Sequence, residues 1–132
     1  MKRFVPLALA FVLSGCCGQA LGLGSVRFVL TEAQAADFVA EPSVVRVCFD
    51  GACFDESGEA LRTRNYDADT RTLTVQHTIE PRGDRGEVTL TVLRRDDTTL
   101  FAHTWPDVAF TTFAPNGETC GPVCGSAGPL AL

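Results

Sequence analysis

The chain has 132 residues, 45% of them hydrophobic and 20% charged, which suits one globular domain and leaves little room for two. Sixteen acidic against eleven basic residues give a formal charge of −5. That balance disfavours a nucleic-acid partner, because phosphate binding draws on clustered positive charge. Six cysteines and twelve glycines in so short a chain indicate an exported, turn-rich β domain and argue against a cytosolic helical enzyme.

The N-terminus has the layout of a secretory signal peptide, which we place at residues 1–15. Lys2 and Arg3 supply positive charge, residues 4–13 form an apolar run, and small residues follow. Ten apolar residues are too few for a helix that crosses a hydrocarbon core, which needs about twenty. The segment is therefore expected to direct export without remaining as a membrane span.

A lipid attachment motif follows directly. Leu13-Ser14-Gly15-Cys16 resembles the lipobox of bacterial lipoproteins. The resemblance implies that Cys16 is acylated and becomes the first mature residue, on the extracytoplasmic side of the cell membrane with the lipid bilayer as its partner. Two or more acyl chains anchor a soluble domain stably. Residues 16–24 are expected to form a flexible tether. The alternative is a freely secreted protein cleaved after Ala20, which also follows small residues.

The rest of the chain, residues 25–132, predicts an all-β domain. It is rich in Val and Thr and is broken repeatedly by Gly, Pro, Asn and Asp, which is typical of a β-sandwich. We expect an immunoglobulin-like antiparallel sandwich of about seven to eight strands with one short helix, which begins at a capping box at Thr31 and ends at Pro42. The expected strands are Ser25–Leu30, Ser43–Phe49, Ala52–Asp55, Arg71–Glu80, Glu87–Arg95, Thr99–Trp105, Val108–Phe113 and Ala127–Leu132.

Two of these strands alternate apolar and polar residues without interruption. Residues 71–80 place Leu73, Val75 and His77 on one face, and residues 87–95 alternate in the same way. We expect the two to pair as a hairpin through the Gly-rich connection at 81–86. His77, in the apolar register, predicts a neutral, hydrogen-bonded imidazole in the core.

The cysteines are expected to form disulfides. Asp50-Gly51 is a strong signal for a two-residue hairpin turn, and counting outward places Cys48 opposite Cys53 in a non-hydrogen-bonded pair, at a separation that a disulfide accepts. The bridge should lie on the outward face. Cys120 and Cys124 flank a Gly-Pro turn and predict a second local bridge, although four cysteines permit three pairings. A metal site is the alternative, and the wide spacing of the first pair and an oxidising compartment count against it.

This combination of two cysteine pairs with Asp-Gly and Pro-Asn-Gly turns resembles small lipoproteins of actinobacterial type with an immunoglobulin-like or transthyretin-like sandwich. That resemblance covers residues 25–132 and implies no known activity.

No catalytic motif is assembled by spacing, and we expect neither an enzyme nor a cofactor. His103 lies two residues before Trp105, and no catalytic sequence motif contains it. The alternating oxygens at 65–69 begin like a calcium loop, but Thr70 and Gln76 stand where a glycine and a glutamate belong, so a polar turn is expected.

Two other surface motifs have simpler readings. Arg82-Gly83-Asp84 resembles an adhesive integrin-binding tripeptide, although any tight turn selects Gly and Asp. Asp96 and Asp97 predict a solvated hairpin tip. Most of the aromatic zone formed by Phe101, Trp105, Phe110 and Phe113 is expected in the core, and any member left exposed would serve as a partner-binding patch.

The leading hypothesis is therefore a lipid-anchored envelope module that binds another envelope protein or a cell-wall component without catalysis. One alternative is a structural accessory subunit of an envelope complex. Another is a hydrolase that uses carboxylates such as Asp67 and Asp69.

Overall fold

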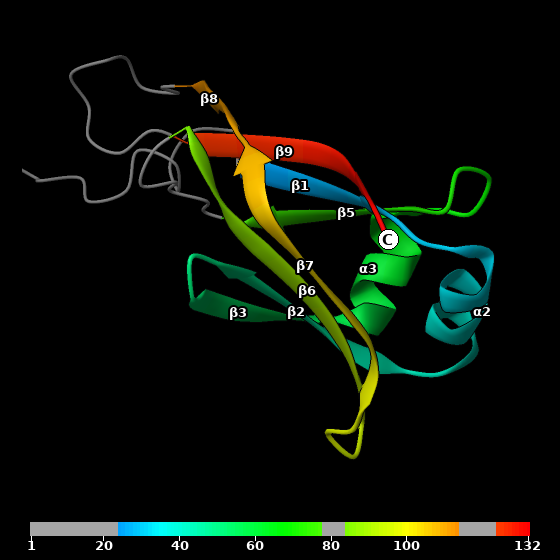
Figure 1. The fold of residues 1–132 in the computed structure, drawn as a ribbon. Helices are drawn as coiled ribbons and strands as arrows, with labels where there is room; N and C mark the ends of the chain where they lie inside the picture. Colours follow the sequence, from blue (N-terminus) through cyan, green and yellow to red (C-terminus); the bar gives the residue numbers. More distant parts are fainter. Residues whose placement is uncertain (1–23, 78–83, 114–123) are drawn as a thin grey trace, which may run out of the picture.

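The fold is a sandwich of two β-sheets with two short helices at one end (Figure 1). The computed structural model describes residues 24–77, 84–113 and 124–132. The strands are β1 (Gly24–Val29), β2 (Ser43–Phe49), β3 (Ala52–Ser57), β4 (Tyr66–Asp67), β5 (Thr72–His77), β6 (Arg85–Arg94), β7 (Thr99–Ala109), β8 (Thr111–Phe113) and β9 (Cys124–Ala131). The helices are α2 (Glu32–Ala40) and α3 (Gly58–Arg64).

The predicted all-β sandwich is confirmed. One sheet has five strands in the order β4-β5-β1-β9-β8, and the other has four in the order β3-β2-β6-β7. Two details differ from the prediction: β1 and β9 pair in parallel, and the chain has a second helix, α3. A parallel pair needs a long crossover, which here is nearly the whole domain.

The core lies between the sheets and is built by strand alternation. In strands β1, β2, β5 and β6 alternate side chains are fully buried, as in β1, where Val26 and Phe28 have no exposed surface. The other fully buried large side chains are Leu30, Phe38, Val45, Val47, Leu73, Val75, Val88, Leu90 and Val92. Burial of this apolar surface is the main force that holds the two sheets together.

Helix α2 begins where the sequence predicts. The Thr31 side chain accepts a hydrogen bond from the backbone of Gln34, and the Gln34 side chain accepts one from the backbone of Thr31, which is a complete capping box. The helix buries Phe38, whose ring meets Tyr66 edge-on with centroids 5.4 Å apart. It thereby closes one end of the sandwich.

The predicted hairpin between residues 71–80 and 87–95 is wrong. Strand β5 pairs with β1 and β4, whereas β6 pairs with β2 and β7 in the other sheet. The alternation of apolar and polar residues is as expected in both strands. It fixes which face of a strand is buried but carries no information about which strand lies beside it.

The last strands also differ from expectation. β7 continues through Pro106 to Ala109, which an edge strand tolerates because its outer side needs no ladder hydrogen bond. At the buried Phe110 the chain then leaves the four-stranded sheet, and β8 joins the five-stranded one. Trp105 packs on Phe28 of the opposite sheet, with ring centroids 5.5 Å apart. Of the aromatic zone expected in the core, Phe110 is buried, Phe101 and Trp105 are partly buried against the core, and the Phe113 side chain lies outside the described part of the chain.

Candidate functional site

The outer face of the five-stranded sheet carries polar side chains and two hollows in the described part of the chain. Strand β1 lies at its centre, and because Val26 and Phe28 point into the core, Ser25, Arg27 and Val29 point outward. The strand register places polar residues beside them. One row across the sheet contains Thr111, Ser126, Ser25 and Gln76, and another contains Val29, Thr72 and Asp67.

A bulge places Arg27 between these rows. Val26 pairs with Ala127 and Phe28 with Leu130, so Arg27 faces two consecutive residues of β9, Gly128 and Pro129. Bulges occur often beside functional sites, where they redirect a side chain. Here the Arg27 guanidinium donates from Nη2 to the Gly128 carbonyl oxygen over 2.9 Å. The bulge therefore fixes the guanidinium across β9.

Glycine is required at position 128. Its φ is +105°, a conformation that other residues rarely adopt. A Cβ there would also lie 2.5 Å from the backbone oxygen of Arg27. The absence of a side chain at this position lets β1 and β9 approach closely and leaves the surface around Arg27 open.

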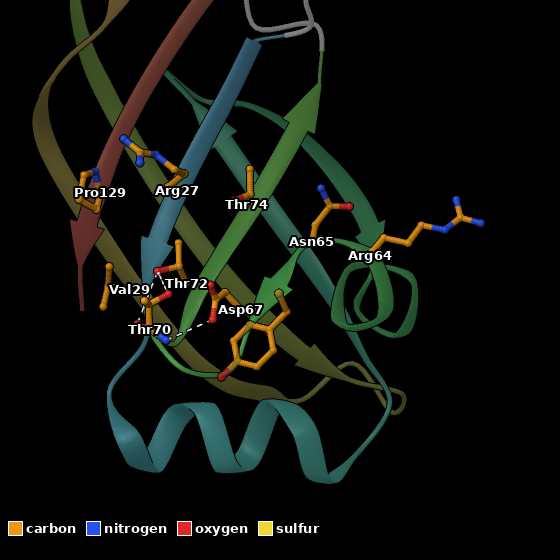
Figure 2. Close-up of a pocket in the computed structure, with 10 residues that line it drawn as sticks. Arg27, Val29, Arg64, Asn65, Asp67, Thr70, Thr72, Thr74 and Pro129 are labelled. Atoms are coloured by element: carbon orange, nitrogen blue, oxygen red, sulfur yellow. Dashed lines mark hydrogen bonds between the residues drawn. The ribbon is translucent and has the colours of Figure 1, made fainter.

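Two hollows lie on either side of Arg27. The larger, of about 650 Å³, covers the α2 end of the sheet, and Figure 2 shows Thr70, Thr72 and Asp67 clustered there. The smaller, of about 300 Å³, lies over β1, β9 and β8. The larger is lined by Arg27, Val29, Arg64, Asn65, Tyr66, Asp67, Thr70, Thr72, Thr74 and Pro129, and the smaller by Ser25, Arg27, Ala109, Thr111, Ser126, Ala127 and Gly128. We call the two hollows together the Arg27 track.

The charge of the Arg27 track is nearly balanced. Arg46, Arg85 and Arg94 each pair with a carboxylate, whereas Arg27, like Arg62 and Arg71, bonds a backbone carbonyl and has no carboxylate partner within the described ranges. A guanidinium carries five N–H donors, so most of its capacity is free for a ligand. Arg64 also borders the larger hollow, but its side chain points away from it in Figure 2.

Asp67 supplies the acidic side of the larger hollow. Its Oδ1 accepts hydrogen bonds from the backbone N–H groups of Asp69, at 2.9 Å, and Thr70, at 3.3 Å. This is an Asx-type turn, and it confirms the polar turn expected in place of a calcium loop. Asp69 does not line the hollow. The carboxylate pair of the hydrolase hypothesis is therefore not brought together over one cavity.

Tyr66 borders the larger hollow from β4. Partial burial raises the pKa of its phenol above the ordinary value, which keeps the hydroxyl protonated and able to donate. Sequence reasoning considered Asn65 and Tyr66 only as part of a calcium loop and missed Arg27 altogether as a site residue. Their lining role depends on strand neighbours that alternation alone does not identify.

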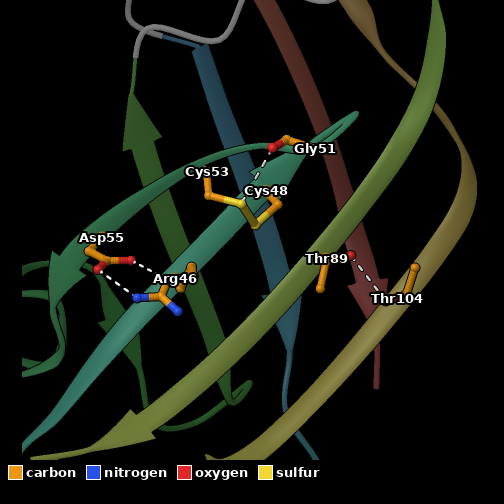
Figure 3. Close-up of a disulfide and its surroundings, with 7 residues drawn as sticks. All are labelled: Arg46, Cys48, Gly51, Cys53, Asp55, Thr89 and Thr104. Carbon is orange, nitrogen blue, oxygen red and sulfur yellow. Dashed lines mark hydrogen bonds and ion pairs between the residues drawn. A yellow bond between two sulfur atoms is a disulfide. The ribbon is translucent and has the colours of Figure 1, made fainter. Parts of the chain in front are cut away.

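The Cys48–Cys53 disulfide is present on the outer face of the four-stranded sheet, as the Asp-Gly turn predicts (Figure 3). The register is also as expected, with Phe49 opposite Ala52. Asp50 and Gly51 both have positive φ, which a two-residue turn of this kind needs. Cys16 and Cys120 lie outside the described residues, and Cys124 begins β9, so the second bridge and the lipidation site stay predictions.

Neither histidine belongs to the Arg27 track. The His77 ring is half-buried and stacks on Phe54 with ring centroids 3.8 Å apart, in keeping with the apolar register. His103 is exposed beside Trp105, with centroids 4.5 Å apart.

The remaining predicted surface motifs lie away from the track. Asp96 and Asp97 form the turn between β6 and β7, where hydrogen bonds from Thr98 lower the pKa of Asp96. Of the Arg82-Gly83-Asp84 motif only Asp84 is described, so the adhesive reading falls outside the described residues. Arg85, the next residue, pairs with Asp107 and holds the pKa of that carboxyl below its usual range.

Within residues 24–77, 84–113 and 124–132, no group of three or more His, Cys, Asp and Glu side chains is arranged to hold a metal ion. The helices in those ranges are too short or too polar to cross a membrane. No protein family, no curated protein and no solved structure matches this chain.

Proposed function

We propose that this chain is a lipid-anchored binding protein of the cell envelope, held by acylated Cys16 and binding its partner on the Arg27 track. The observation that carries the proposal is the open polar surface around an arginine without a carboxylate partner among the described residues. The lipobox-like Leu13-Ser14-Gly15-Cys16 supports the anchor. The partner is another envelope protein or a cell-wall component, and no catalytic step is invoked.

The position of the larger hollow supports presentation away from the membrane. A tether from Cys16 reaches the domain at Gly24, the first residue of β1. The larger hollow lies by Val29, at the opposite end of the same strand. A strand of this length separates the two by about 17 Å. The net negative charge of the chain also opposes docking flat on an anionic bilayer.

The anchor is tested by metabolic labelling with palmitate. Wild type should take up label and Cys16→Ala should not. Cys17→Ala is the matched control, because it removes the adjacent thiol and should leave labelling intact. Equal labelling of wild type and Cys16→Ala would remove the anchor from the proposal.

Binding is tested with the detergent-solubilised full chain and the detergent-insoluble, protein-containing fraction of washed cell envelopes, with detergent kept in excess so that the acyl group at Cys16 has no bilayer to enter. Wild type should sediment with the envelopes, and Arg27→Ala should stay largely in the supernatant. Arg95→Ala is the control, because Arg95 is exposed at the turn after β6, away from the Arg27 track. Undiminished sedimentation of Arg27→Ala would overturn the assignment of the site.

A further inference from the structure

We propose that the ligand of the Arg27 track is a linear glycan that lies across the strands of the five-stranded sheet and fills both hollows at once. This inference rests on the proposed function and names its substrate class. Arg27 lines both hollows, and Gly128 and Pro129, which face it, line one hollow each. The two hollows are therefore neighbouring parts of one surface, and a ligand that crosses Arg27 contacts both.

Recognition at this surface must come from side chains. Strand β1 is paired on both sides, with β5 and with β9, so its backbone groups are already used by the sheet. An extended peptide that binds by strand addition needs an exposed sheet edge. The centre of the Arg27 track offers none. This favours a ligand whose own functional groups, and not a polypeptide backbone, make the hydrogen bonds.

The side chains of the Arg27 track match sugar hydroxyls. A hydroxyl both donates and accepts, and the track offers hydroxyls that do the same, a carboxylate that accepts and a guanidinium that donates. The members with these groups, or with an amide that also donates and accepts, are Ser25, Arg27, Asn65, Tyr66, Asp67, Thr70, Thr72, Thr74, Thr111 and Ser126. Val29 and Pro129 add a small apolar area that can contact the C–H face of a sugar ring.

Other polymers fit this surface less well. A phosphate-bearing chain needs several cations, whereas the track has one guanidinium aimed along it and an opposing carboxylate. The fully buried centre of a protein–protein interface is more apolar than the rest of a protein surface and is depleted of charged residues. The large apolar side chain that is most exposed in the described part of the chain is Val39, which lies on α2 beside a different hollow.

The geometry sets a minimum length for the ligand. The Arg27 track runs from Thr111 on β8 to Asp67 on β4, across four strand spacings. At about 4.8 Å each, these amount to about 19 Å. A disaccharide can therefore occupy one hollow, and only a longer oligomer can occupy both.

The test is calorimetric titration of the solubilised full chain with oligosaccharides from disaccharide to hexasaccharide. The probes are β-1,4-linked glucose, β-1,4-linked N-acetylglucosamine and α-1,4-linked galacturonate, so that neutral and carboxylate-bearing units are distinguished. For at least one series we expect Kd to fall about tenfold or more with length and then level off, because the second hollow adds hydrogen bonds. Binding of none of the three series, or a Kd independent of length, would overturn the glycan assignment.

Variants separate the two hollows. Arg27→Ala should weaken the hexasaccharide about tenfold or more, since it removes charged hydrogen bonds at the centre of the track. Thr111→Val should weaken the hexasaccharide and leave the tightest-binding disaccharide unchanged if that disaccharide occupies the larger hollow, while Thr72→Val should weaken both. Thr104→Val, on the outer face of the other sheet, is the matched control and should change neither. A hexasaccharide affinity that none of these variants alters would also contradict the inference.

The two proposals can fail separately. If Arg27→Ala abolishes sedimentation with envelopes but no oligosaccharide binds, the binding function stands and the glycan class is wrong. If the oligosaccharides bind equally to wild type and Arg27→Ala, the site itself is wrong. Circular dichroism melting of each variant shows that a loss of binding is not a loss of folding.

Discussion

The outer faces of the two sheets are built from the same kinds of residue but use them differently. On the four-stranded sheet the polar and sulfur groups satisfy one another: Cys48 bonds Cys53, Arg46 pairs with Asp55, and Thr89 shares a hydrogen bond with Thr104 (Figure 3). On the five-stranded sheet Arg27 bonds only a backbone carbonyl and lies between two hollows. An alternating strand thus makes a closed or an open surface according to what its neighbours offer.

The difference follows from strand register. β2 runs against β3 and β6 without interruption, and the two register shifts between β6 and β7 lie on either side of the Thr89–Thr104 pair, so the side chains that face each other pair directly. β1 and β9 shift register at Arg27. Two residues of β9 then face one of β1, and neither Gly128 nor Pro129 has a side chain that can pair with a guanidinium.

The largest expected effect comes from adding a side chain at the register shift between β1 and β9. Gly128→Ala adds a Cβ where φ is +105° and the Arg27 carbonyl lies 2.5 Å away, so we expect the free energy of unfolding to fall by about 3 kcal/mol. Urea denaturation measures it. Ser126→Ala, in the same strand, is the control and should change stability far less. Equal stability of the two variants would mean that the bulge tolerates a side chain.

The second prediction concerns the disulfide on the outer face of the four-stranded sheet. The free energy of unfolding of the Cys48→Ala/Cys53→Ala double variant should be about 2 kcal/mol lower than that of wild type, because the unfolded chain is no longer crosslinked. The effect is modest because the bridge closes only a short loop. Its binding to envelopes should equal that of wild type, since the bridge lies on the other sheet. A loss of binding in a folded double variant would show that the two faces are not independent.

Removing the hydrogen bond between Trp105 and Ala131, which joins the two sheets, should have a smaller effect on stability. The Trp105 indole N–H of β7 donates to the Ala131 carbonyl of β9 over 3.2 Å. Trp105→Phe keeps an aromatic ring against Phe28 and removes this bond, so we expect a loss of about 1 kcal/mol in guanidinium denaturation followed by circular dichroism. His103→Ala, a neighbouring exposed position, is the comparison and should cost less.

The smallest effect concerns the Arg46–Asp55 ion pair, whose side chains are 43% and 47% exposed. The hydrogen bond from Arg46 lowers the pKa of Asp55. The pair therefore stabilises the fold above the ordinary aspartate pKa of about 4, and this contribution is lost as pH falls through the lowered value. NMR titration should show the Asp55 pKa rising toward its ordinary value in Arg46→Gln. An unchanged pKa would mean that the pair does not persist in solution.

Local features were predictable from the sequence because they depend on residues close in the chain. The capping box at Thr31 and the bridge across Asp50-Gly51 need only a few neighbouring residues each, and both are confirmed. Helix α3 also had a local signal that was missed. Ser57 caps it by accepting from the Ala60 N–H, and Glu59 and Arg64 match its dipole.

The Arg27 track was not predictable in the same way. It depends on which strands lie beside β1, and both of these neighbours, β5 and β9, are far away in the sequence. For this reason the expected pairing of residues 71–80, which contain β5, with residues 87–95, which include most of β6, is wrong, and the two strands belong to different sheets. In the sequence Gly128 and Pro129 look like ordinary residues of a terminal strand. Their role in the bulge is recognised only when Arg27 is known to face them.

The pairing of β1 with β9 bears on when the protein folds. Arg27 and Gly128 are 101 residues apart in the sequence. The five-stranded sheet therefore cannot form completely until β9 pairs with β1. Contacts of such long range form slowly. Under the proposal that the chain is exported, a polypeptide that emerges N-terminus first would lack the Arg27 track until β9 has crossed the membrane, because β9 supplies Gly128 and Pro129.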